Sequence, residues 1–116
     1  MRLAIRKTNG TSEVRFKVEA DGTVYCTEVR VRPTTAIPDY VFKPEYDLRS
    51  FQELREFLQA NNHLPNVPSE KEIIEQGGTN VNEMQMKLLE KVEELTLYIL
   101  ELDQRNSDLE KKIEEL

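Results

Sequence analysis

A heptad repeat of apolar residues runs through the last third of the chain. The d positions are Val81, Leu88, Leu95, Leu102, Leu109 and Leu116, and the a positions are Gln85, Val92, Ile99, Asn106 and Ile113. The register is unbroken over about five repeats. A helix over residues 81–116 is roughly 54 Å long at about 1.5 Å per residue, too long to be covered by a small monomer. We therefore expect it to pair with copies of itself or with another helix.

The heptads leave the number of helices open between two and three. β-branched residues at a with leucine at d, and Asn106 at an a position, favour a parallel dimer. Arg105 at g followed by Glu110 at e instead resembles the Arg-x-x-x-x-Glu pattern of parallel trimers, with Asn106 in place of the usual apolar residue. A homotrimer and a homodimer are both possible on this evidence.

The composition fits an assembly better than a self-sufficient globule. Of 116 residues, 38% are apolar and 33% are charged, with no tryptophan and a net charge of −6. No apolar run approaches the roughly 20 residues of a membrane span, and the N-terminus lacks the apolar run of a secretory signal. We expect no membrane span and no targeting signal. The acidic C-terminal half, without a basic region before the heptads, argues against nucleic acid as a partner.

Residues 1–33 alternate between apolar and polar side chains, which predicts half-buried strands. The apolar set is Leu3 and Ile5, then Val14, Phe16 and Val18, then Val24 and Cys26. Asn9-Gly10 and Asp21-Gly22 fall between these runs and suit tight turns, so we expect a three-stranded meander. A change in the alternation predicts a bulge or bend near Thr27-Glu28. Three short strands cannot close a core alone.

Residues 34–80 are predicted to form a proline-rich connector followed by a collar of short helices. Three capping motifs mark helix starts, at Ser50 with Glu53, Ser69 with Glu72, and Asn80 with Glu83. The first helix should end at Asn61-Asn62 and the second at Gly77-Gly78.

The first helix is expected to pack on the long one. Beyond a and d, apolar residues also occupy Leu89, Leu97, Tyr98 and Leu100, which therefore need a cover. The natural cover is the apolar face of the first helix, with Ile73 and Ile74 as a further contribution. The residues predicted to pack in this collar are Phe51, Leu54, Phe57, Leu58, Leu97, Tyr98 and Leu100.

No side chains form a convincing catalytic, cofactor or metal site. One cysteine and one histidine exclude an intrachain disulfide and a Cys/His zinc cluster built from one copy. We expect Cys26 to be a small core residue and His63 to make a structural hydrogen bond near a helix end. Glu93 and Glu94 are expected to be solvated on the coil surface. The chain is therefore expected not to be an enzyme.

Four segments together resemble the C-terminal module of bacteriophage tail-fibre-like and bacterial surface fibre proteins. They are residues 38–42, 48–50, 63–69 and 88–98, with sequences PDYVF, LRS, HLPNVPS and LLEKVEELTLY. The resemblance covers about residues 36–104, and residues 16–31 are similar to the last β repeat of such fibres. It implies a parallel homotrimer in which the module nucleates trimerisation, sets register and promotes folding in a chaperone-like way. It also implies a place on a virion tail fibre or a bacterial surface.

These observations predict an α+β structural protein in three parts. Residues 1–33 form a β-strand fibre repeat, 34–80 a connector and helical collar, and 81–116 a coiled-coil trimerisation helix. The expected partners are further copies of the chain and, by resemblance, an upstream fibre shaft or a host surface receptor. The alternative function is a multivalent adhesin that binds a host glycan or protein, which an exposed cluster of Tyr25, Tyr40 and Tyr46 would favour.

Overall fold

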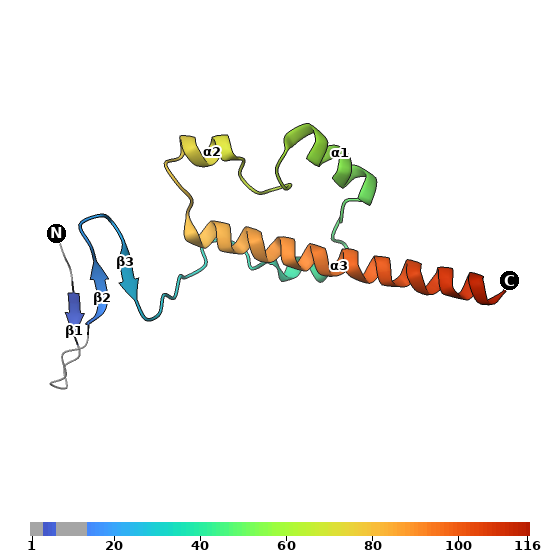
Figure 1. Cartoon of the computed structure of the whole chain (residues 1–116), viewed down its shortest axis with the longest axis horizontal. Coiled ribbons are helices and arrows are strands. Elements are labelled where there is room, and N and C mark those ends of the chain that lie inside the picture. Colours follow the sequence, from blue (N-terminus) through green and yellow to red (C-terminus); the bar gives the residue numbers. More distant parts are fainter. Residues whose placement is uncertain (1–3, 7–13) are drawn as a thin grey trace. The chain divides into compact units, whose positions relative to one another are not determined.

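A computed structural model describes residues 4–6 and 14–116 of the chain (Figure 1). The expected Leu3 strand position and the Asn9-Gly10 turn lie outside the described residues. Contacts divide the chain into two units, Met1–Val31 and Arg32–Leu116. The first unit holds strands and the second holds helices, which confirms the α+β class.

The first unit is an antiparallel sheet in the order β1-β2-β3, built from Ala4–Arg6, Val14–Val18 and Val24–Cys26. In its register Phe16 lies opposite Cys26 and Val18 opposite Val24, so the alternating apolar residues share one face. The described part of the meander therefore has the expected order and alternation.

The turn between β2 and β3 forms where Asp21-Gly22 predicts it. Gly22 adopts a φ of +91°, which glycine takes without steric cost. The amide of Thr23 donates to the Asp21 carboxylate at 2.9 Å, and the amide of Glu19 donates to the Thr23 carbonyl at 2.9 Å. The chain then leaves the sheet through a bend at Thr27, as expected.

The expectation that Cys26 is a core residue is wrong for the single chain, because its side chain is exposed. Val24 on the same face is exposed as well, and so is Val14, where the register of β1 and β2 shifts. In the described residues of this unit the sheet is one layer of short strands, which leaves its apolar face uncovered.

The second unit contains a 3-10 helix, η1 (Pro38–Phe42), and the helices α1 (Phe51–Asn61), α2 (Glu70–Glu75) and α3 (Val81–Glu114). Each α-helix begins at its predicted cap. The side chains of Ser50, Ser69 and Asn80 accept hydrogen bonds from the amide of the residue three positions later, at 3.1–3.2 Å. These bonds satisfy donors that a helix start otherwise leaves free.

The helix ends also follow the sequence. Asn62 takes a left-handed conformation after α1, with φ of +57°. Gly77 and Gly78 have positive φ after α2, and the Gly78 amide donates to the Ile73 carbonyl at 3.0 Å. None of the described helices is long and apolar enough to cross a membrane.

The element that packs most closely on α3 is η1. Pro38 and Val41 of η1 are the fully buried side chains of this unit. The connector therefore lies along α3 and fixes which of its faces stays open.

Candidate oligomerisation surface

The a and d side chains of α3 are exposed in the single chain. From Leu88 to Ile113, the exposed fraction of the apolar ones lies between 48% and 67%. Asn106, in the same stripe, is exposed too. The residues predicted for oligomerisation are thus all at the surface, available to a partner: Val81, Leu88, Val92, Leu95, Ile99, Leu102, Asn106, Leu109, Ile113 and Leu116.

The opposite face of α3 is covered by the chain itself, and it is polar. Glu90, Glu93 and Glu94, at positions f, b and c, are only 6–9% exposed. The expectation that Glu93 and Glu94 are solvated is therefore wrong. The connector runs along this face in the same direction as α3 and supplies hydrogen-bond donors to two of its carboxylates, which is how buried charged groups are tolerated.

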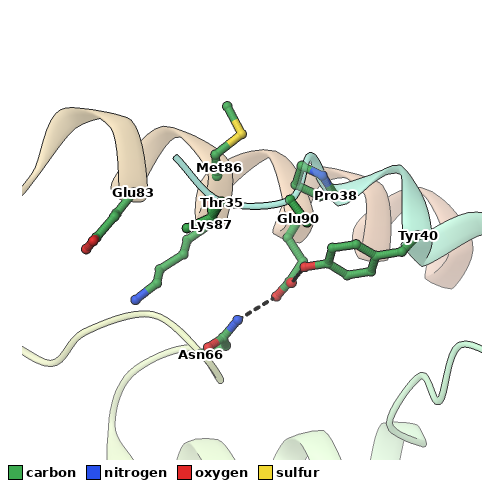
Figure 2. A pocket seen from close by; sticks show the side chains of 9 residues that line it. Thr35, Pro38, Tyr40, Asn66, Glu83, Met86, Lys87 and Glu90 are labelled. Carbon is green, nitrogen blue, oxygen red and sulfur yellow. Dashed lines mark hydrogen bonds between the residues drawn. The ribbon is translucent and has the colours of Figure 1, made fainter. Parts of the chain in front are cut away.

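Two tyrosines of the connector bind the carboxylates of α3. The hydroxyl of Tyr40 donates to Glu90, and Asn66 Nδ2 donates to the other oxygen of Glu90 at 3.1 Å (Figure 2). The hydroxyl of Tyr46 donates to Glu94 Oε2 at 3.0 Å. We call these five residues the polar clasp.

A buried lysine joins the two halves of the polar clasp. Lys91 Nζ lies 2.5 Å from Glu94 Oε1 and 3.2 Å from Glu90 Oε1. Such charge-assisted bonds are stronger than those between neutral groups.

The polar clasp changes the ionisation of its members. The hydrogen bond to Glu90, then burial and the nearby carboxylates, raise the pKa of Tyr40 to about 12. Burial and the bond to Glu94 raise the pKa of Tyr46 as well. Burial alone would raise the pKa of Glu90, but the donors Tyr40, Asn66 and Lys91 together lower it. At neutral pH the phenols are therefore protonated and Glu90 is ionised.

Glu93 differs from its neighbours because one of its carboxylate oxygens has no donor and because Asp39 lies beside it. Its Oε2 atom is buried without a hydrogen-bond partner. Burial, followed by the repulsion of the neighbouring Asp39 carboxylate, raises the pKa of Glu93. The same connector thus favours the charge of Glu90 and disfavours that of Glu93.

The predicted collar forms in part. Tyr98 is buried, its hydroxyl donates to the Arg49 carbonyl at 2.8 Å, and its ring centroid lies 5.1 Å from that of Phe51. The Arg105 guanidinium lies 5.0 Å from the Phe51 ring centroid.

Other apolar residues around α3 remain open. Leu97 is half-buried, whereas Leu89, Leu100, Leu58 and Ile74 are exposed. The expected covering of the outer apolar positions by the first helix and the Ile73-Ile74 turn is therefore incomplete in the single chain. Sequence reasoning missed η1 as the main cover, because a segment of five residues, with one proline and two aromatics, is too short to show a helical period.

His63 has the structural role that its position predicts. Its Nδ1 donates to the Leu64 carbonyl at 2.8 Å, and its ring meets Phe57 edge-on with centroids 5.6 Å apart. Within the described ranges, no three His, Cys, Asp or Glu side chains gather in a way that could hold a metal ion.

A hollow of about 420 Å³ opens beside the polar clasp (Figure 2). Its lining is mixed, and the clasp supplies three of its residues. The lining residues are Thr35, Ala36, Pro38, Tyr40, Asn66, Glu83, Met86, Lys87 and Glu90. Because Tyr40, Asn66 and Glu90 are bonded to one another, these polar groups already serve to hold the connector on α3.

No family model matches the chain, and no curated protein or solved structure matches it. The resemblance to fibre modules therefore stays a prediction, and the functional argument depends on the geometry of α3 and its surroundings.

Proposed function

We propose that this chain is a structural module that assembles three copies through a parallel coiled coil of α3. The observation that carries the proposal is the contrast between the two faces of α3. The chain holds the polar face with its own connector and leaves the apolar heptad stripe bare along a helix of 34 residues. A continuous exposed apolar surface of this kind marks an interaction site.

The charges that flank the stripe support a parallel arrangement. Arg105 and Lys112 lie at g positions and Asp103 and Glu110 lie at e positions, whereas Lys91, also at g, is buried and already pairs with Glu90 and Glu94 of its own chain. In a parallel coil the g side of one helix lies beside the e side of the next, so opposite charges meet. In an antiparallel coil, g would meet g and e would meet e, and like charges would repel.

Three copies rather than two are favoured by the Arg105 and Glu110 spacing and by the resemblance to fibre modules. In this proposal the coil forms first from local contacts and then aligns the three sheets, whose pairing involves more distant contacts. The exposed apolar face around Val14, Val24 and Cys26 would be buried between copies. A role at the end of a virion or bacterial surface fibre is proposed on the resemblance alone.

The adhesin alternative finds less support in the aromatic residues. Tyr40 and Tyr46 are half-buried, and their hydroxyls donate to Glu90 and Glu94. These two hold the connector on α3, whereas Tyr25 of the sheet is 54% exposed, so one of the three tyrosines meets the condition for the adhesin alternative.

The test is the double substitution Leu95→Asp with Ile99→Asp, measured by light scattering after size exclusion and by circular dichroism. We expect the wild-type mass to be that of three chains and the variant to be a monomer with weaker helical signal. The matched control, Gln104→Asp with Ser107→Asp, adds the same charge at the outer positions f and b and should stay trimeric. A monomeric wild type, or a monomeric variant with unchanged dichroism, would refute the proposal.

A further inference from the structure

The apolar stripe of α1 is only partly used within its own chain. Phe51, Leu54 and Leu58 follow the three-and-four spacing that places them on one helical face. Phe51 contacts Tyr98, and Leu54 lines a mainly apolar hollow of about 70 Å³ between α1 and α3. Leu58, at the far end of the stripe, is exposed, as is Leu64 just beyond α1. The stripe therefore extends past what its own α3 covers.

The side of α3 on which α1 lies is defined by its contacts. The hollow is lined on α3 by Lys91 and Tyr98 at g, Glu94 at c and Leu95 at d. The helix α1 thus lies over the g side of its own α3.

The other side of α3 carries two apolar residues without a cover. Leu89 at e is 36% exposed and Leu100 at b is 58% exposed. Neither belongs to the a and d stripe, so a coiled coil alone would leave both at its surface. An α-helix with its side chains is about 10 Å across, which separates this side from the chain's own α1.

A parallel coil brings the two sides together between neighbouring copies. The outer groove between two adjacent helices is lined by the g and c positions of one and the e and b positions of the next. In such a coil, α1 of one copy would lie along the groove that contains Leu89 and Leu100 of its neighbour. The lengths agree, because Leu89 and Leu100 are 11 positions apart and α1 has 11 residues, about 16 Å in each case.

We propose that α1 is an interchain clasp that covers Leu89 and Leu100 of the neighbouring copy with its whole apolar face, from Phe51 through Leu54 to Leu58. The partner is a second copy of this chain, and the inference rests on the proposed parallel assembly. Each copy would cover the next around the ring, a head-to-tail contact that closes under rotational symmetry. The clasp would thus hold neighbouring helices together outside the heptad core.

The test is chemical cross-linking between cysteines placed at the two ends of the proposed contact. Cys26→Ser removes the native thiol, and Leu58→Cys with Leu89→Cys is then treated with a short bismaleimide. Two reactive sites per chain, each joined to a different neighbour, should give covalent trimers on a denaturing gel. Mixing chains that carry only Leu58→Cys with chains that carry only Leu89→Cys before refolding should give covalent dimers.

The matched control is Leu58→Cys with Lys87→Cys. Lys87 lies two residues from Leu89, hence at nearly the same height on α3, but at position c on the other side of the helix. We expect this pair to give no covalent trimer.

The possible results distinguish a failure of the interchain clasp formed by α1 from a failure of the proposed assembly. Suppose that the uncross-linked cysteine variant has the mass of three chains, but that cysteines 58 and 89 are joined only within one chain or no more efficiently than the control pair. The interchain clasp is then overturned, while the proposed assembly stands. If the Cys26→Ser chain and the wild type are both monomeric by light scattering, the proposed assembly fails and the clasp fails with it.

Discussion

Two neighbouring carboxylates on α3 show how the connector selects its contacts residue by residue. Glu90 receives donors from Tyr40, Asn66 and Lys91, while Glu93 faces Asp39 and has a buried oxygen without a partner. Both are about equally buried. The difference between them therefore comes from hydrogen bonding and local charge, not from exposure.

We predict that Glu93→Gln stabilises the protein at neutral pH, by about 1 kcal/mol, because it removes a poorly solvated charge beside Asp39. The pKa of Glu93 is raised above its ordinary 4.5, so the folded chain holds this proton more tightly than the unfolded chain. The penalty of ionised Glu93 thus grows as pH rises above about 4.5 and disappears at lower pH. Urea unfolding at one fixed chain concentration, at pH 7 and at pH below 4.5, measures this difference.

The control substitution, Glu90→Gln, should act in the opposite direction. The pKa of Glu90 is lowered from its ordinary 4.5, so ionised Glu90 stabilises the folded chain above about pH 4.5. This stabilisation is lost as the pH falls through the lowered pKa that Glu90 has in the folded chain. We expect a loss of about 1–3 kcal/mol at neutral pH, typical of a broken hydrogen bond to a charged group. If both variants shift stability in the same direction, the distinction drawn between the two carboxylates is wrong.

The sequence alone cannot predict the polar clasp, whereas it can predict the role of His63. His63 bonds to the next residue, so its environment is local. Tyr40 and Glu90 are 50 residues apart, and Tyr46 and Glu94 are 48 apart. Neither pair has a sequence pattern that joins it, because the contact depends on how the chain between them returns, through α1 and α2, to lay α3 beside the connector.

At the scale of elements, local chemistry decides where helices begin and end, and it is readable in the sequence. The three caps and the two helix ends are confirmed because each depends on residues within one turn. The cover of α3 was predicted less well. An amphipathic period predicts α1 as the cover, yet the closest packing comes from Pro38 and Val41 of η1.

Ser50→Ala tests whether the N-cap of α1 contributes to the stability of the folded unit. The substitution removes the acceptor for the Glu53 amide, which costs about 1 kcal/mol at a helix N-cap. We expect a thermal midpoint lower by several degrees in circular dichroism, since a change of this size moves the midpoint of a small domain by about 4–8 °C.

Gln59→Ala on the exposed side of α1 is the matched control and should leave the midpoint unchanged or slightly raised. Equal midpoints for Ser50→Ala and the wild type would mean that α1 contributes nothing to the cooperative unit.

At the scale of the whole molecule, only 38% of the residues are apolar, and many of them lie at the surface of the single chain. In the described residues, the longest continuous set of exposed apolar side chains is the heptad stripe of α3, and Val24 of the sheet and separate residues such as Val29, Ile37 and Ile74 are exposed too. The proposed symmetric assembly would bury the stripe and the apolar face of the sheet together. If the proposed assembly forms, the folded unit is the oligomer, and stability and assembly should be lost together.

Asn106 provides a direct test of that coupling, because it is the polar residue in the middle of an exposed apolar stripe. In an assembled coil it would be enclosed at an a position, where burying an amide costs about 1–3 kcal/mol if it is poorly paired. Asn106→Ile should therefore raise the thermal midpoint and keep the mass of three chains, with Arg105 and Glu110 still placed to pair between copies. Gln104→Ile, at outer position f, should give no such gain. An unchanged or lowered midpoint for Asn106→Ile would mean that the stripe does not close around residue 106, and that the coil ends before it.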